Sequence, residues 1–337
     1  MIANVVGMGA RGPLGLSSLQ VATSVRARRF EPRSVALRDR HGHEIGLALA
    51  GGHGERLTGF ERHVALAAPP LVEAHLEAGI DPRRTNVPLV LCLPEPGRPD
   101  DDPRFEGAIV DELVKASGRG LDLARSSVVR LGHAGFAEAL RRARGLLDGG
   151  VEHVVVGGVD SHYHAGVLRW LDATYRLYGI DSENGFIPSE AAAFLVLSRD
   201  PGEGGRGRRL GRILAAELGD EPSARDEALP NTGEAMTALV LRALELGGSP
   251  GLVLTDENAE AHRQLEWERV TARLLRLVAR ETWVWHTGEV GAATGALFAT
   301  IYARLSAFGA RADGRALLAL HSELGARGVV VLEGDHG

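Results

Sequence analysis

The apolar residues of this chain gather in short continuous runs that alternate with longer stretches of helical spacing. Runs of four to eight apolar residues bounded by glycine, proline or charged residues predict buried β-strands. A short strand is expected within 3–15, where it breaks into a Gly/Pro turn. The other predicted strands are 87–93, 126–131, 152–160, 191–199, 212–218, 250–256, 282–288, 316–322 and 327–333.

The longer stretches place apolar residues three and four positions apart, as Phe136, Leu140 and Leu147 do, which predicts amphipathic helices. The predicted helices are 59–79, 135–150, 232–248, 261–281 and 291–308, and we expect Pro69–Pro70 to kink or interrupt the first. Strands alternate with helices twice over, which favours an α/β architecture with sheets covered by helices. The Gly/Arg-rich segment 199–211 is the best candidate for a junction between two halves.

Composition narrows the class of protein. The chain has 337 residues, 44% of them hydrophobic, a net charge of −6 and 5% aromatic residues. It contains no run of about 18 apolar residues and no secretory signal pattern, so we expect no membrane span and a cytoplasmic location. The acidic balance and the scarcity of aromatic residues argue against a nucleic-acid partner. The only cysteine, Cys92, lies in a buried strand pattern and is interpreted as a small core residue.

Three local features receive a brief interpretation. The arginine-rich segment 25–42 is either a solvated loop or edge strand, or a patch that docks an acidic partner. His162 and His164 would face the same way on a strand, but no third ligand is near in sequence, so no metal site is predicted. The opening residues 5–12 lack the full spacing of a dinucleotide fingerprint, so no cofactor is predicted.

Six segments resemble, in order, the β-ketoacyl synthases of the thiolase superfamily. "VVGMGARGPLG" resembles the family's opening strand and turn, and "GFERHVALAAPPLVEAHLEAGIDP" the helix after its first loop. "LLDGGVEHVVVGGVDS" is similar to the Gly-Gly strand downstream of the active-site cysteine, and "ENGFIPSEAAAFLVLS" to the "DGF-x-x-GEGAG" segment, with Ser189 in place of a glycine. "TGEVGAATGAL" resembles the "TGH-x-x-GAAG" turn, and "HSELGARGVVVLE" the closing "NSFGFGG" turn and strand.

The resemblance implies a five-layer αβαβα thiolase-like fold made of two similar halves, here 1–200 and 201–337. It also implies a two-fold dimer that shares the strand before the nucleophile turn, residues 126–131 in this chain.

The residues that carry condensing chemistry in the family differ at every matched position. Counting back from Gly157–Gly158 places Gly132 where the family has its nucleophilic cysteine, with His133 next to it. A glycine has no side chain to accept an acyl group. Thr255 and Glu289 stand where the family has its two histidines.

The flanking positions do not restore this chemistry. Val284 stands where the family has a lysine, and His286 lies close to it in sequence. We interpret His286 as a buried, hydrogen-bonded histidine rather than a catalytic one. No catalytic residue is therefore predicted, and Gly132, His133, Thr255, His286 and Glu289 are predicted to form a vestigial pocket.

The sequence therefore predicts a ketosynthase-like protein without condensing activity that acts as a binding, scaffold or partner subunit. The resemblance implies a homodimer, or a heterodimer with a related subunit as in chain-length-factor partners, and an acyl-carrier protein as a possible partner. A protein client such as a secretion-system component is a further alternative. The competing interpretation is an acyl-thioester enzyme, for condensation or for acyl transfer or hydrolysis, in which His133, His286 and Glu289 form a rearranged acid–base set.

Overall fold

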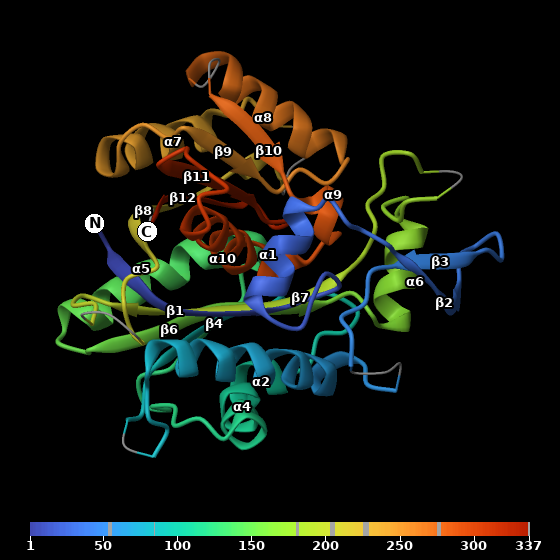
Figure 1. The fold of residues 1–337 in the computed structure, drawn as a ribbon. Helices are drawn as coiled ribbons and strands as arrows, with labels where there is room; N and C mark the ends of the chain where they lie inside the picture. The colour runs from blue at the N-terminus through green and yellow to red at the C-terminus, as the bar shows by residue number, and fades with distance from the viewer. Residues whose placement is uncertain are drawn as a thin grey trace.

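Ten strands join into one continuous sheet in the computed structural model of the chain (Figure 1). The structure describes residues 1–52, 56–83, 85–179, 182–202, 206–224, 229–274 and 278–335. The first half of the sheet contains β1 (Ala3–Arg11), β4 (Leu89–Cys92), β5 (Ser127–Val129), β6 (His153–Ser161) and β7 (Glu190–Ser198). The second half contains β8 (Gly211–Asp220), β9 (Leu252–Thr255), β10 (Ala279–Thr282), β11 (Arg315–His321) and β12 (Ala326–Gly334).

The helices and a separate hairpin complete the fold. The helices are α1 (Ser18–Arg26), α2 (Gly59–Ala78), α3 (Arg104–Gly107), α4 (Ile109–Ser117), α5 (Gly135–Asp148), α6 (Ala165–Ala173), α7 (Glu234–Gly247), α8 (Ala261–Leu274), α9 (Val284–Thr287) and α10 (Thr294–Ala307). The hairpin pairs β2 (Arg33–Arg38) with β3 (Glu44–Leu47), so part of the arginine-rich segment is a strand.

The two groups of five strands repeat the same topology. The strand order is β1-β7-β6-β4-β5 in the first group and β8-β12-β11-β9-β10 in the second. In both groups the first two pairings are antiparallel and the last two parallel. The groups meet where β1 pairs with β8 through Ala3, Asn4 and Val5. The same chain path is therefore built twice, and equivalent turns of the two groups face each other.

Helices form three layers around the two groups of strands (Figure 1). Helices α5 and α10 lie between them, α2 and α4 cover the outer face of the first, and α7 and α8 cover the outer face of the second. The sequence explains why α10 lies in the middle layer, because nearly all of its residues are apolar or small and buried on every side. This arrangement confirms the predicted α/β fold with five layers.

Helix α2 packs closely on β1 and runs through Pro69–Pro70 without interruption. A Cβ atom on Gly9 would lie 2.0 Å from the carbonyl oxygen of Pro70, and one on Gly7 2.3 Å from that of Ala74. The glycines of the opening strand therefore let the helix approach the sheet backbone. The predicted interruption of the helix is wrong, and the continuous packing against β1 is the physical reason.

Two other local predictions are corrected. Residues 282–288 were predicted to be a strand, but β10 lies earlier, at Ala279–Thr282, and Val284–Thr287 form the short helix α9. The strand is placed by its parallel pairing with β9, which apolar spacing alone does not reveal. The helix predicted over 261–281 ends at Leu274, and its residues 275–277 lie outside the described part of the chain. Residues 203–205 of the predicted junction also lie outside it.

The described residues also bear on membrane and metal binding. None of their helices is both long and apolar enough to span a membrane. Strand β6 ends at Ser161, so His162 and His164 lie in the turn before α6 rather than on a strand, and the premise of a shared strand face is wrong. Within the same residues, no three histidine, cysteine, aspartate or glutamate side chains gather in a group that could hold a metal ion.

Candidate functional site

The turn between β5 and α5 contains Gly132 in a conformation that favours glycine. Its φ is +54°, and its amide N–H donates to the carbonyl oxygen of Leu93 at 3.3 Å. After one 3-10 turn, Gly132–Ala134, the chain enters α5, and the amide of Ala134 donates to Ser322 Oγ at 2.9 Å. A side chain at position 132 would be strained by its backbone conformation.

The space in front of Gly132 is occupied by the carboxylate of Glu95. A Cβ atom on Gly132 would lie 3.1 Å from Glu95 Oε2. The same oxygen accepts a hydrogen bond from the amide of Glu323 at 2.9 Å, and Oε1 accepts one from the amide of Leu324 at 2.8 Å. Burial raises the pKa of Glu95, an effect that these two amides partly oppose. Sequence reasoning missed Glu95, because it lies in a loop after β4 that carries no recognisable motif.

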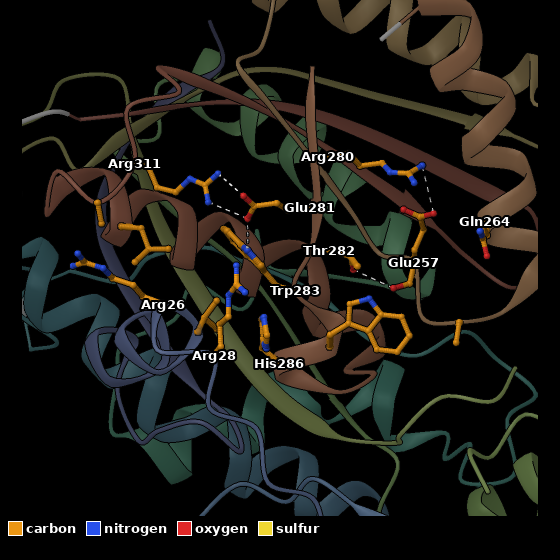
Figure 2. A pocket seen from close by; sticks show the side chains of 15 residues that line it. Arg26, Arg28, Glu257, Gln264, Arg280, Glu281, Thr282, Trp283, His286 and Arg311 are labelled. Atoms are coloured by element: carbon orange, nitrogen blue, oxygen red, sulfur yellow. Dashed lines mark hydrogen bonds and ion pairs between the residues drawn. The ribbon is translucent and has the colours of Figure 1, made fainter. Parts of the chain in front are cut away.

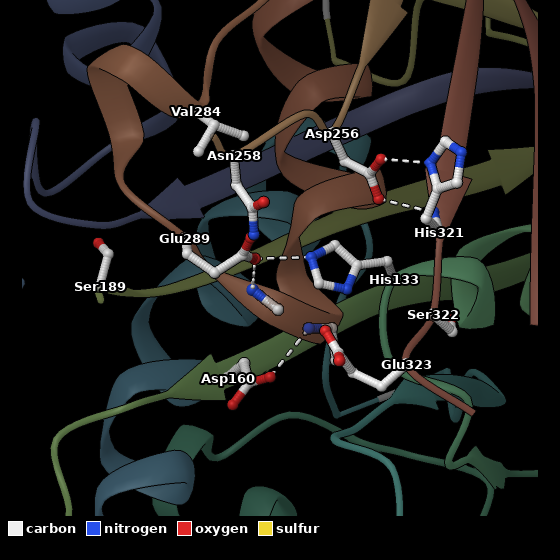
Figure 3. Close-up of polar contacts among 12 residues, drawn as sticks. His133, Asp160, Ser189, Asp256, Asn258, Val284, Glu289, His321, Ser322 and Glu323 are labelled. Atoms are coloured by element: carbon white, nitrogen blue, oxygen red, sulfur yellow. Dashed lines mark hydrogen bonds and ion pairs between the residues drawn. The ribbon is translucent and has the colours of Figure 1, made fainter. Parts of the chain in front are cut away.

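His133, the residue after Gly132, pairs with Glu289 in the buried interior (Figure 3). His133 Nε2 lies 2.6 Å from Glu289 Oε1. Asn258 Nδ2 donates to Glu289 Oε2 at 2.6 Å, and the amide of Gly291 donates to Oε1 at 2.9 Å. Three donors therefore surround one buried carboxylate.

Arg263 links this pair to a second acid–histidine pair. Its guanidinium lies 3.5 Å from His133 Nε2, 3.3 Å from Asp256 Oδ2 and 2.8 Å from Glu323 Oε1. Asp256 in turn accepts hydrogen bonds from the amide of His321 at 2.6 Å and from its Nδ1 at 2.7 Å (Figure 3). A buried network of acids and bases therefore connects α8 and the end of β11 with the turns that precede α5 and α10.

The network fixes the charges of its members. Burial opposes ionisation of Asp256, but His321 and Arg263 lower its pKa to about 2. Burial also acts to raise the pKa of Glu289, but His133 and Arg263 outweigh this effect and hold it well below its usual range. Burial acts to lower the pKa of His133, but the carboxylate of Glu289 reverses this and raises it. His133 and Glu289 are therefore held as an ion pair.

A small cavity of about 190 Å³ opens beside this network. Gly132, His133 and Glu289 all line it, as the sequence predicted for the vestigial pocket. Its apolar wall comes from α6 and the segments that flank it, and includes Trp170, Leu171 and Phe186. No serine, threonine, cysteine, lysine or tyrosine is found among the described residues that line the cavity.

The other two residues of the predicted pocket lie elsewhere. Thr255 is buried at the end of β9 and donates to Glu257 Oε2 at 2.6 Å, away from the cavity lining. His286 lies on α9, is only half-buried and lines a different cavity. The three-residue set of His133, His286 and Glu289 is therefore not brought together, and the interpretation of His286 as a buried histidine is wrong, because the residue is half-buried.

A pseudo-symmetric turn stands opposite Gly132. Gly291 precedes α10 as Gly132 precedes α5, with φ of +50°. A Cβ atom there would lie 1.9 Å from Asp160 Oδ2, which accepts a hydrogen bond from the amide of Ala292 at 2.9 Å. Asp160 also binds Arg98 Nη2 at 2.7 Å. In both turns a glycine therefore lies directly beside a carboxylate. The carboxylate is Glu95 at Gly132 and Asp160 at Gly291.

Three solved structures similar to this chain contain ketosynthases, and each matches nearly the whole length of the chain. A mutant form of the ketosynthase from module 6 of the bacillaene synthase of Bacillus subtilis 168 matches 99% of this chain and 72% of its own, with 14% identity and a TM-score of 0.77. A type II polyketide synthase acyl-carrier protein in complex with its ketosynthase bound to the hexaketide matches 98% and 99%, with 12% identity and a TM-score of 0.75. The ishigamide ketosynthase/chain length factor matches 99% of both chains, with 20% identity and a TM-score of 0.71.

The chain has the fold of these ketosynthases. The resemblance noted in the sequence is thereby confirmed for the fold. No protein-family model matches the chain. No curated protein matches it either.

Cys92 lies near the turn that contains Gly132 but does not line the cavity. It ends β4 and is fully buried, and a Cβ atom on Gly135 at the start of α5 would lie 3.7 Å from its sulfur. Burial raises the pKa of the Cys92 thiol, so the neutral form is favoured. Although residues 92 and 132 are far apart in sequence, the parallel pairing of β4 with β5 brings them near each other.

Proposed function

We propose that this protein is a non-catalytic member of the ketosynthase fold that acts as a binding, scaffold or partner subunit. The observation that carries the proposal is the carboxylate of Glu95, which faces Gly132 and accepts the amide hydrogens of Glu323 and Leu324. In the family, the same turn holds a nucleophile whose reaction builds negative charge on an acyl oxygen. Here the position has no nucleophile, and a resident carboxylate occupies the nearby amide donors.

Electrostatics makes the arrangement unsuitable for acyl transfer by the family mechanism. An oxyanion is stabilised by preorganised donors that are free to receive it. Two donors beside Gly132 are already satisfied by Glu95, and the charge of that carboxylate would repel a second anion within about 4 Å. Glu289, in place of a family histidine, is held as an anion by His133 and Arg263 and has no proton to give.

For assembly, we propose pairing with a second copy or a related subunit through the free edge of β5. Support comes from the position of β5, which ends the sheet in the described residues and leaves one edge unpaired. An unpaired strand edge is a ready surface for continuing a sheet. Each protomer would consist of the halves 1–200 and 201–337, and an acyl-carrier protein is a candidate client because a similar structure contains one with its ketosynthase. A role in fatty acid or polyketide biosynthesis and a cytoplasmic location belong to the same proposal.

The alternative proposal, an acyl-thioester enzyme with a rearranged site, rests on the pair formed by His133 and Glu289. Both line the cavity, and a histidine beside a carboxylate is a familiar acid–base arrangement. His133 would then be the residue to carry an acyl group or to activate water. In the structure its Nε2 is occupied by Glu289, which is why we favour the non-catalytic proposal.

The two proposals are separated by incubating the purified chain with acetyl-CoA, malonyl-CoA and an acyl-carrier protein loaded with a hexanoyl group. We expect intact mass spectrometry to find no acyl adduct, and thioester hydrolysis to proceed no faster than in a His133→Ala variant. An adduct mapped to His133 or Cys92, or hydrolysis lost in the variant, would refute the non-catalytic proposal. Light scattering of the same sample tests pairing with a second copy, which a monomeric mass at micromolar concentration would contradict.

A further inference from the structure

A second and larger cavity, of about 650 Å³, lies beside α1, β10 and α9 and is lined by arginines from three separate segments (Figure 2). Arg26 ends α1, Arg28 follows it, Arg280 belongs to β10, and Arg311 precedes β11. The glutamates that line the cavity, Glu257 and Glu281, are outnumbered two to one. The cavity therefore carries an excess of two positive charges in a chain whose net charge is −6.

The carboxylates of the cavity are already engaged by groups other than Arg28. Arg311 binds both oxygens of Glu281 at 2.9 Å, and Trp283 Nε1 donates to the same carboxylate at 3.1 Å. Glu257 accepts a hydrogen bond from Thr255 and lies 3.8 Å from Arg280. Figure 2 shows Arg28 between His286 and the pair formed by Arg311 and Glu281.

Arg26 and Arg28 are exposed, and neither forms a close ion pair within the described part of the chain. Burial acts to raise the pKa of Glu281, but Arg311 and, to a smaller extent, Arg28 lower it. Burial lowers the pKa of His286, and the positive charge of Arg28 lowers it further. A guanidinium presents its N–H donors in a planar fork that matches the oxygens of a phosphate. Arg28, which has no close ion-pair partner among the described residues, is therefore suited to binding an oxyanion.

The backbone of the lining is strained at two points. Arg28 has φ of +53° and Ala259 φ of +77°, which are left-handed conformations that residues other than glycine seldom adopt. Both residues line this cavity. Such conformations carry a cost and tend to occur where a side chain or backbone group is held in a specific position.

Trp285 gives the cavity a planar apolar surface. Trp285 lines the cavity and is 57% exposed. Such exposure is unusual for a tryptophan, which is mostly buried in folded proteins. The floor of the cavity includes the buried Val25 and Leu305. An exposed indole on the same cavity lining as Arg28 supplies a surface for a ring and a charge for its phosphate.

We propose that this cavity binds a small organic phosphate with a planar ring, with Arg28 holding the phosphate and Trp285 packing against the ring. A cavity of this volume with an apolar floor fits a small molecule better than the flat surface of a protein partner. The site is separate from the cavity beside Gly132 and does not depend on whether the chain retains acyl chemistry.

The test uses ADP and pyrophosphate as probes, measured by isothermal titration calorimetry on the purified chain at low ionic strength. We expect Arg28→Ala to weaken binding of both probes by about tenfold or more, the loss of one charge-assisted contact. Arg29→Ala is the matched control, because Arg29 is exposed in the same segment and is absent from the cavity lining. We expect Trp285→Ala to weaken binding of ADP but not of pyrophosphate.

Each contrary result overturns a stated part of the proposal. If neither probe binds at millimolar concentration, or if Arg29→Ala causes an equal loss, the cavity is not an oxyanion site. If Trp285→Ala leaves the affinity for ADP unchanged, the ring contact is wrong. Binding of an octaglutamate peptide without binding of ADP would assign the surface to an acidic protein segment instead. Melting temperatures of all variants establish that each one is folded.

Discussion

The ion pair between His133 and Glu289 makes a quantitative prediction about stability. Replacing Glu289 by alanine removes a buried carboxylate that accepts hydrogen bonds from His133 and Asn258 at 2.6 Å and from the amide of Gly291 at 2.9 Å. Removing one partner of a buried ion pair costs about 3–5 kcal/mol, because the other partner stays buried without compensation. We expect Glu289→Ala to lower the free energy of unfolding by that amount.

The corresponding change in melting temperature follows from the length of the chain. An unfolding entropy of about 2.1 cal/mol/K per residue over 337 residues gives about 0.7 kcal/mol/K. A loss of about 3–5 kcal/mol therefore lowers Tm by roughly 4–7 °C. Glu112→Ala is a suitable control, since its partner Lys115 and Glu112 itself are exposed, and surface pairs of this kind contribute about 1 kcal/mol or less. We expect its Tm to change by about 1 °C at most.

The pKa shifts of His133 and Glu289 determine how the loss in Tm varies with pH. The pKa of His133 is raised in the folded protein, so its contribution is present below about pH 6.5, the unfolded value, and is lost as pH rises through the folded value. The pKa of Glu289 is lowered, so its contribution is present above about pH 4.3 and is lost as pH falls through the folded value. The difference in Tm between the wild type and Glu289→Ala should thus be greatest near pH 5.5–6.5 and shrink by pH 9.

Differential scanning calorimetry at pH 5.5 and pH 9 measures this difference directly. A Tm difference that is the same at both pH values would mean that Glu289 acts only through packing and neutral hydrogen bonds. A difference no larger than that of Glu112→Ala would contradict the buried ion pair itself.

Two further predictions concern glycines. The thiol of Gly132→Cys should react slowly with iodoacetamide, because the carboxylate of Glu95 disfavours the thiolate. Adding Glu95→Gln should speed labelling by about tenfold, which corresponds to one unit in the pKa of the thiol. Equal labelling rates in the single and the double variant, with Cys92 as the internal reference, would count against a carboxylate in front of the turn. Gly9→Ala should lower the free energy of unfolding by about 1–3 kcal/mol in denaturant titration, because its Cβ would meet the carbonyl oxygen of Pro70. Gly46→Ala, with no atom within 4 Å of the added Cβ, should be nearly neutral, and a similar loss in both would refute the packing argument.

The buried strands were predictable because their signal is local. The continuous apolar runs of β6 and β7 could only lie inside a sheet covered on both faces, and the all-apolar α10 could only lie between layers. The order of the motifs then pointed to the fold, which the similar structures confirm. The edge strand β10 was misplaced, because its residues are half exposed and only pairing with β9 distinguishes them from the neighbouring turn.

The candidate site divides in the same way. The sequence shows directly that position 132 has no side chain and that position 289 is acidic. Both residues line one cavity in the structure. His133 and Glu289 are 156 residues apart, and their pairing depends on the packing of α5 beside α10. Glu95 in front of Gly132 has no sequence signal at all, because a carboxylate in a loop is ordinarily solvated.

The sequence by itself thus determined most of the buried strands and long helices, and which side chains are missing at the positions matched to the reacting residues of ketosynthases. Tertiary structure alone decided what fills the space those side chains would leave. It placed Glu95 against Gly132, joined Arg263 to two acid–histidine pairs, and turned His286 toward a separate arginine-lined cavity. The physical reason is range: apolar periodicity acts between neighbours along the chain, whereas charges and hydrogen bonds act between whichever groups the folded layers bring together.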